Sequence, residues 1–175
     1  MSKPISLVPE VDPSPAALAP ARFEDLVQAE HARLYSALCL ITRDRAEAED
    51  VMQEALLRVW ERWDRVRDMA DPVGYLYRTA MNLFRKRTRR ASLALRRAIR
   101  IAPAPDELAE VEAREVVVQA LGALTPRQRA SVVLVDLLDF SSDEAGKVLG
   151  IKAPTVRVLV SQGRAALKRN AGEQE

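Results

Sequence analysis

Two capping signals and one glycine divide the C-terminal third of the chain into short helices. Thr125 is followed three residues later by Gln128, and Ser141 is followed three residues later by Glu144. Each pair predicts a capping box, in which side chains satisfy the unpaired N–H groups at a helix start. Gly150 is a residue type that commonly ends a helix, and a further helix is expected from residue 153. Three helices, the last two joined by a tight turn, predict a helix-turn-helix.

The rest of the chain also carries helical patterns. Apolar residues recur every three or four positions over residues 23–42, 45–63 and 72–90, and the first of these stretches is either one helix or two short helices broken near His31. The 175 residues contain only six glycines, and no stretch alternates apolar and polar residues. We therefore expect an all-α protein with two small helical domains joined by a flexible linker.

The stretch 45–63 predicts a helix with one buried and one acidic face. Its buried positions are Ala48, Val51, Met52, Ala55, Val59 and Trp63, and its acidic positions are Glu47, Asp50, Glu54 and Glu61. Trp60 shares this helix, and burial is expected for both tryptophans. An exposed acidic face is typical of a solvated surface or of a surface that binds a partner, and the spacing of its carboxylates is a weak indication of a metal site.

The next helix becomes strongly basic. Nine Lys or Arg and no Asp or Glu lie between residues 72 and 105, although the whole chain has a net charge of only +2. Val73, Leu76, Tyr77, Ala80 and Phe84 are the expected core positions. The opposite face carries Tyr75, Arg78, Asn82, Arg85, Lys86 and Arg89. Such a face is either a solvated charge run or a nucleic-acid surface, and the aromatic and the amide among the cations favour binding of a single strand.

The last helix has the pattern of a recognition helix. Its expected buried positions are Val156, Val160, Gly163 and Leu167. Its outward positions are Lys152, Thr155, Arg157, Ser161, Gln162, Arg164 and Lys168. These side chains could read base edges and bind phosphates in the major groove of DNA, whereas the alternative is an ordinary helical hairpin with a solvated face.

The sequence predicts five segments. They are a Pro-rich tail (1–21), a first domain (22–92), a linker (93–112), a second domain (113–170) and a short tail (171–175). Cys39 is the only cysteine and His31 the only histidine, and no phosphate loop or nucleophile motif is present, so we expect no catalytic residue, no metal and no cofactor. We found neither a signal-peptide pattern nor a long apolar run, and we expect a cytoplasmic protein with no direct membrane insertion.

Four segments in order resemble the extracytoplasmic-function (ECF) group of bacterial sigma-70-type sigma factors. They are "AEAEDVMQEALLRVW" at 46–60, "PVGYLYRTAMNLFRKRTRR" at 72–90, "ALGALTPRQRASVVLVDLLDFSSDEAGKVLGI" at 120–151 and "TVRVLVSQGRAALKR" at 155–169. The resemblance runs from residue 23 to residue 169. It implies two domains similar to sigma regions 2 and 4, and a subunit that directs core RNA polymerase to promoter DNA.

The resemblance also implies roles for individual residues. Asp50, Gln53 and Glu54 would bind core polymerase. Tyr75, Arg78, Asn82, Arg85, Lys86 and Arg89 would hold the minus-ten strand. Lys152, Thr155, Arg157, Ser161, Gln162 and Arg164 would read the minus-35 duplex, and an anti-sigma factor is expected as a further partner. The sequence departs from the family pattern at Gly146, Lys152, Pro154, Leu159, Gln162 and Gly163, and Gly163 is expected to cost about 1 kcal/mol relative to Ala inside a helix.

The linker length predicts how the two domains act on DNA. A flexible linker of about 22 residues averages roughly 25 Å between its ends and reaches about 70 Å only when stretched, which is about the length of two turns of DNA. A large partner would therefore have to hold the domains apart, and we expect weak specific DNA binding by the free chain. The alternatives are a stand-alone helix-turn-helix regulator that dimerises on a palindrome and an RNA-binding helical protein.

Overall fold

The computed structural model describes residues 20, 22–97, 117 and 119–172. Those residues form helices and turns, without a strand among them. The helices are α1 (Phe23–Thr42), α2 (Arg45–Trp60), α3 (Trp63–Val66), α4 (Pro72–Arg97), α6 (Pro126–Val132), α7 (Ser142–Leu149) and α8 (Ala153–Gly172), and a short π-helix, η1 (Val133–Leu137), continues α6. The prediction of an all-α fold is confirmed.

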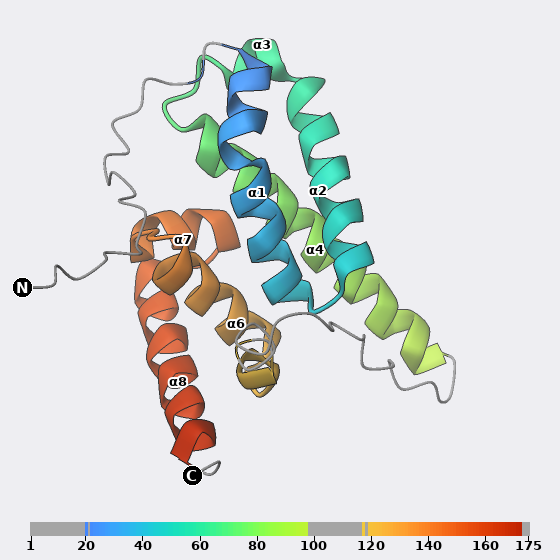
Figure 1. Cartoon of the computed structure of the whole chain (residues 1–175). Coiled ribbons are helices and arrows are strands. Elements are labelled where there is room, and N and C mark those ends of the chain that lie inside the picture. Colours follow the sequence, from blue (N-terminus) through green and yellow to red (C-terminus); the bar gives the residue numbers. More distant parts are fainter. Residues whose placement is uncertain (1–19, 21, 98–116, 118, 173–175) are drawn as a thin grey trace, which may run out of the picture.

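Helices α1 to α4 make up what we call the N-terminal unit. Helix α2 packs against both α1 and α4, and α3 caps one end of this bundle (Figure 1). Leu34, Leu38, Val51 and Leu76 are completely or almost completely buried between these helices. Of the two alternatives for residues 23–42, the single helix is confirmed: α1 is continuous because these residues contain neither Gly nor Pro, and His31 lies on its exposed side.

The C-terminal unit contains α6, η1, α7 and α8. Both predicted capping boxes are present, with the Thr125 and Ser141 side chains accepting hydrogen bonds from the N–H groups of Gln128 and Glu144. Gly150 ends α7 with a φ of 65°, a left-handed conformation that glycine adopts without strain. Helix α8 packs on α6 and α7, so the predicted helix-turn-helix is confirmed.

Two helix boundaries differ from the sequence prediction. Helix α2 ends at Trp60, and a turn at residues 61–62 separates it from α3. Helix α4 continues to Arg97 instead of ending near residue 90, so it extends into the segment predicted as the start of the linker. The rest of the predicted linker, residues 98–112, and both predicted tails apart from residues 20, 171 and 172 lie outside the described residues.

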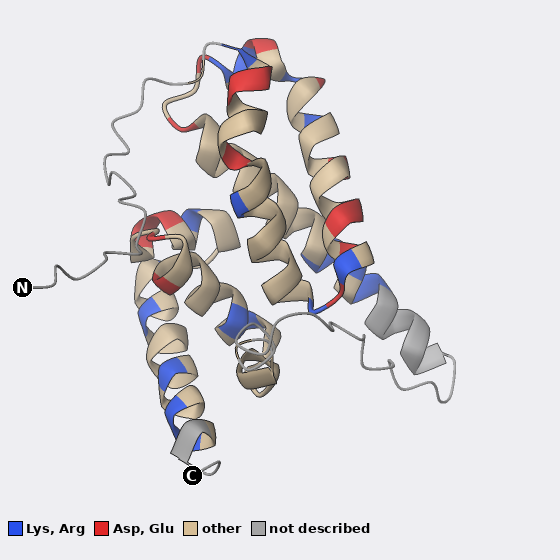
Figure 2. Cartoon of the chain, in the orientation of Figure 1, with Lys and Arg blue, Asp and Glu red and all other residues tan. Residues whose placement is uncertain are grey.

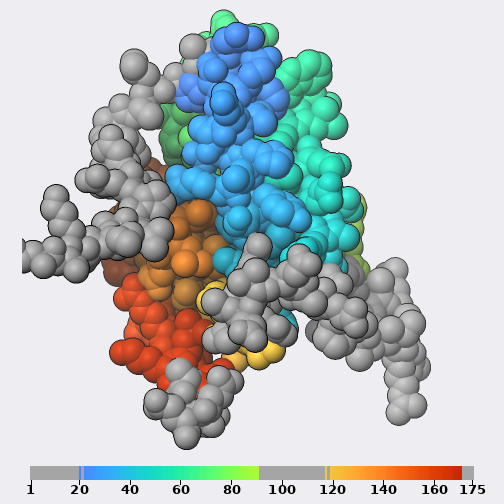
Figure 3. Space-filling model, in the orientation of Figure 1, coloured from blue at the N-terminus to red at the C-terminus, as the bar shows by residue number. Residues whose placement is uncertain are grey.

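The two units pack against each other. Helix α7 lies along α4, and α6 and η1 contact α1. The space-filling view shows the atoms of the C-terminal unit directly against those of α1 (Figure 3). The buried apolar side chains of both units form one contiguous cluster. The two predicted recognition surfaces therefore lie on two helical units that pack against each other.

Candidate functional site

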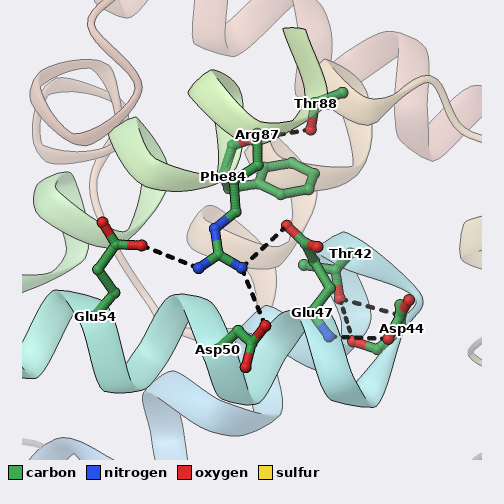
Figure 4. Close-up of polar contacts among 8 residues, drawn as sticks. All are labelled: Thr42, Asp44, Glu47, Asp50, Glu54, Phe84, Arg87 and Thr88. Carbon is green, nitrogen blue, oxygen red and sulfur yellow. Dashed lines mark hydrogen bonds and ion pairs between the residues drawn. The ribbon is translucent and has the colours of Figure 1, made fainter. Parts of the chain in front are cut away.

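The acidic face of α2 is fixed in place by one arginine of α4. Asp50 and Gln53 are exposed and Glu54 is half-buried. Arg87 donates to Glu54 at 2.9 Å and to Asp50 at 3.4 Å, and lies 4.0 Å from Glu47 (Figure 4). The hydrogen bond from Arg87, with the nearby charge of Arg58, lowers the pKa of Glu54, and the bond to Glu54 raises the pKa of Arg87. Both groups are therefore charged at neutral pH.

The sequence prediction did not separate Arg87 from the neighbouring cations. Arg87 follows Ala80 by seven residues and Phe84 by three, so the helical period places it on the side of α4 that faces α2. Its side chain is 31% exposed, compared with 66% for Asp50. Arg87 therefore neutralises part of the negative charge of the acidic face from the side of α4, and Asp50 remains accessible to solvent.

Trp60 extends the acidic face of α2 with an exposed apolar surface. Its predicted burial is wrong, because Trp60 is 59% exposed at the end of α2 and Leu57, one turn earlier, is 54% exposed. Trp63 is half-buried in α3, where its ring meets Phe23 edge-on at 5.7 Å. Gln53, Leu57 and Trp60 follow one another at helical spacing on one face. Tryptophan is enriched in protein–protein interfaces relative to the rest of the protein surface.

The basic face of α4 begins at an ordered cap. Asp71 accepts a hydrogen bond of 2.7 Å from the N–H of Gly74. Tyr75 is half-buried, with the Arg78 guanidinium 5.4 Å from the centre of its ring and Arg62 donating to its hydroxyl at 3.3 Å. This arrangement places an aromatic ring among cations at the start of the face.

The rest of the predicted strand-binding set follows along α4. Its exposed members are Arg78, Asn82, Arg85, Lys86 and Arg89. The Arg85 guanidinium donates to the Asn82 side-chain oxygen and also to the carbonyl of Leu149 in the C-terminal unit. One residue of this set is therefore engaged with the turn of the helix-turn-helix.

The predicted outward face of α8 is exposed. Val156 and Val160 are buried and Gly163 lies inside the packing, as predicted, while Leu167 is half-buried. The exposed residues are Lys152, Thr155, Arg157, Ser161, Gln162, Arg164 and Lys168. Four of them, Arg157, Ser161, Arg164 and Lys168, line a hollow of about 510 Å³ beside η1. Basic residues recur along α8 in Figure 2.

One cation of α8 has an internal partner that the sequence prediction did not include. Arg164 donates through Nε to Asp136 of η1 at 3.0 Å, and this bond raises the pKa of Arg164. Asp136 therefore competes with any phosphate for Arg164. The Gln162 side chain accepts a weaker bond of 3.4 Å from Gln128.

The described residues give no support for two other kinds of site. They contain no cluster of three His, Cys, Asp or Glu side chains arranged to hold a metal ion. None of the helices in the described part of the chain combines the length and the apolar character needed to cross a membrane.

The chain matches two protein-family models in succession. Residues 26–94 match sigma-70 region 2, and residues 114–167 match sigma-70 region 4. The ECF RNA polymerase sigma factor SigM of Mycobacterium tuberculosis is 30% identical over 151 residues, which cover 86% of this chain and 77% of SigM. The RNA polymerase sigma-E factor of Streptomyces coelicolor is 27% identical and is covered to 84%.

Solved structures share the fold. The sigma factor RpoE from Bartonella quintana, crystallised with the anti-sigma factor NepR, has a TM-score of 0.71 at 20% identity, and the match covers 84% of this chain and 94% of RpoE. CnrH in complex with the cytosolic domain of CnrY has a TM-score of 0.61 at 24% identity, with 87% and 89% covered. The sequence matches, the two consecutive regions and the helical fold together assign the family: the chain belongs to the ECF sigma factors of bacterial RNA polymerase.

Proposed function

We propose that this sigma factor uses three separate faces for its three contacts with the transcription machinery. The acidic face of α2 binds core polymerase, the basic face of α4 holds the minus-ten strand, and the outward face of α8 reads the minus-35 duplex. The observation that carries the proposal is the exposure of nearly all these side chains on three different helices. Promoter selection needs all three contacts in one chain.

The core-binding face consists of Asp50, Gln53 and Glu54, and we add Leu57 and Trp60 to it. Asp50 is the most accessible carboxylate of the Arg87 cluster. Trp60 offers an exposed aromatic surface at the end of the same helix, about 15 Å along the axis from Asp50. Interfaces draw most of their binding energy from a few such residues surrounded by polar contacts. A basic and partly apolar surface of the polymerase clamp would complement this face.

The two DNA-binding faces differ in the contacts that they offer. On α4, Tyr75 and the cations around it suit an unpaired strand, whose bases stack on aromatic rings while phosphates bind Arg and Lys. On α8, Thr155, Ser161 and Gln162 offer hydrogen bonds to base edges, and Arg157 and Arg164 offer charge to phosphates. Each type of face matches the form of DNA proposed for it.

An anti-sigma factor is proposed as a further partner. The support is that RpoE and CnrH, which share this fold, were both solved in complex with proteins, and in the case of RpoE the partner is described as an anti-sigma factor. We also propose that the chain acts in the cytoplasm, where RNA polymerase works, and that it has no catalytic activity of its own.

Site-specific photocrosslinking in the assembled polymerase–promoter complex tests the assignment of faces. A benzophenone amino acid replaces Gln53, Lys86 or Ser161, and the matched control replaces His31, an exposed residue of α1 outside all three sets. We expect crosslinks from position 53 to the largest core subunits, from 86 to the minus-ten strand and from 161 to the minus-35 duplex. Crosslinks from 86 and 161 that do not differ from those of the control would contradict the proposal.

A further inference from the structure

We propose that a groove between α4 and the C-terminal unit binds an amphiphilic carboxylate, that is, a small molecule with an anionic head and an acyl body, such as a fatty acid. The groove has a volume of about 630 Å³ and is lined by residues of α4, α6, α8 and the end of α7. It is separate from the hollow beside η1. The site goes beyond the three contacts proposed for transcription and does not depend on them.

One wall of the groove is a single face of α4. Met81, Phe84, Arg85, Thr88 and Arg89 line it, and their spacing places them on one side of the helix. Met81 is 2% exposed and Phe84 is half-buried, whereas the other three side chains are exposed. This wall is therefore apolar toward the start of α4 and polar and cationic further along the helix.

The opposite wall belongs to the C-terminal unit and is mainly apolar. Ala130 of α6 and Leu149 at the end of α7 are buried, and Ile151 and Leu159 are half-buried. Leu159 is one of the positions at which the sequence departs from the family pattern, and the helical pattern placed it in neither the buried nor the outward set of the last helix. The groove gives this leucine an apolar environment and a candidate role that the promoter contacts did not.

The charge of the groove is complementary to an anion. Four cations and no carboxylate are among the described residues that line it: Arg85, Lys86 and Arg89 of α4, and Arg127 of α6. The Arg85 guanidinium is held by a side chain of its own helix and by the carbonyl at the end of α7, which use two of its five N–H donors. A guanidinium that is fixed in this way suits a carboxylate, which it can bind through two parallel hydrogen bonds.

The size of the groove favours a small molecule over a protein helix. Small-molecule sites are concave, mainly apolar and roughly 300–1,000 Å³ in volume, with a few polar groups that fix the orientation of the ligand. A helix is about 10–12 Å wide with its side chains, so three turns of it take up roughly 1,300 Å³ or more. An acyl chain is narrower. It would bury its methylenes against the apolar walls while its carboxylate meets the cations.

Isothermal titration calorimetry of the full chain with dodecanoate, below the concentration at which it forms micelles, tests the site. We expect saturable binding of one dodecanoate per chain. Decanoate is two methylenes shorter and should bind about tenfold more weakly or worse, because each buried methylene contributes roughly fourfold in affinity. Dodecyltrimethylammonium, which joins a similar chain to a cationic head, should not bind measurably. No binding of dodecanoate, or equal affinities for the two dodecyl compounds, would overturn the proposal.

Two variants locate the site. Arg127→Glu reverses the charge of an exposed residue that belongs to none of the proposed DNA or polymerase sets, and Leu159→Glu places a charge in the apolar wall. Each should weaken dodecanoate binding about tenfold or more, whereas Arg127→Lys should retain most of the affinity. Because Arg127 is exposed, its variants test the site even if Leu159→Glu does not fold.

Matched controls change the same residue types outside the groove. They are Arg65→Glu on α3 and Leu137→Glu on η1, both at exposed positions, and they should leave the affinity for dodecanoate unchanged. Controls that weaken binding as much as Arg127→Glu and Leu159→Glu would show that dodecanoate binds without using the groove, and would overturn the proposal.

Two other occupants of the groove would give different results. If a second copy covers it, the unmodified chain should sediment as a dimer and Leu159→Glu as a monomer. If a protein partner covers it, an acidic amphipathic peptide should bind in a manner that depends on Arg127, and dodecanoate should not bind. Either result would overturn the proposal. The calorimetry needs neither polymerase nor DNA, so a chain that binds dodecanoate as expected but fails to direct transcription would refute the proposed function and leave the site established.

Discussion

Arg87 of α4 and Glu54 of α2 form an ion pair of 2.9 Å that joins the proposed strand-binding helix to the proposed polymerase-binding helix. Arg58 reaches the same carboxylate at 2.6 Å. Glu54 is thus a structural partner within the N-terminal unit as well as a candidate contact for polymerase. Asp50, which is twice as exposed, is the better probe of polymerase binding alone.

The charge-reversal variants Asp50→Arg and Glu54→Arg should therefore behave differently. Asp50→Arg is expected to weaken core binding about tenfold with little loss of stability. Glu54→Arg would place a third cation beside Arg58 and Arg87, and we expect it to weaken binding and to reduce the free energy of unfolding by about 1 kcal/mol. Core affinity and thermal melts measure both effects, with Asp25→Arg on α1 as the control. Equal affinities for Asp50→Arg and the control would show that the acidic face is only solvated.

Trp60 should matter for binding and not for folding. Truncation of an interface tryptophan commonly costs at least about 2 kcal/mol of binding energy, roughly 30-fold in affinity, whereas an exposed substitution changes stability by about 0.5 kcal/mol or less. We expect Trp60→Ala to lose core affinity on this scale with an unchanged melting temperature, and Trp60→Phe to retain most of the affinity. Unaltered affinity for Trp60→Ala would remove Trp60 from the interface.

Asp136 should restrain promoter binding through Arg164. Asp136→Asn removes the charge that holds Arg164, so the assembled polymerase should bind its promoter more tightly. The slope of log affinity against log salt concentration should steepen by the amount expected for about one additional phosphate contact. Arg157→Ala, which removes an exposed cation, should make that dependence shallower by about the same amount. Filter binding across a salt series measures the slopes. If Asp136→Asn has the same slope as the unmodified chain, Asp136 does not restrain Arg164 in promoter binding.

Gly163→Ala should destabilise the chain, contrary to the expectation from helix propensity. A Cβ atom at Gly163 would lie 2.7 Å from Cγ2 of the buried Val132, so the glycine allows α8 to approach α6 closely. Overpacking of about 1–3 kcal/mol outweighs the propensity gain of about 1 kcal/mol. Gly146→Ala should be worse, because its Cβ would lie 2.8 Å from the backbone oxygen of Ile151 in the turn before α8. A higher melting temperature for Gly163→Ala would refute this reading.

Local chemistry was the most predictable part of the fold. The capping boxes at Thr125 and Ser141 depend on side chains three residues apart, and the end of α7 depends on a single glycine. These helix boundaries are therefore determined by residues that are close together in the sequence. The burial of Val156 and Val160 and the exposure of Arg157 follow in the same way from the helical period. The family resemblance added what this period does not contain, namely the partner that is proposed for each exposed face.

The errors occurred where tertiary structure decides. Trp60 fits the helical period of α2, but the chain turns immediately after it and leaves the ring on the surface. Arg129 was not singled out, because its burial depends on packing: its guanidinium donates to the carbonyls of Leu121 and Leu124 and to that of Ile41 in α1. The ion pair between Arg164 and Asp136 joins residues 28 positions apart, which no local pattern reveals.

Run-off transcription with purified core polymerase tests the central claim most directly. The full chain is added to core enzyme with a library of promoter fragments, and the products are sequenced. The account predicts transcripts that start at particular promoters and only when the chain is present, with Asp50→Arg and Trp60→Ala reducing their yield. A chain that neither associates with active core polymerase nor yields any promoter-specific transcript would contradict it.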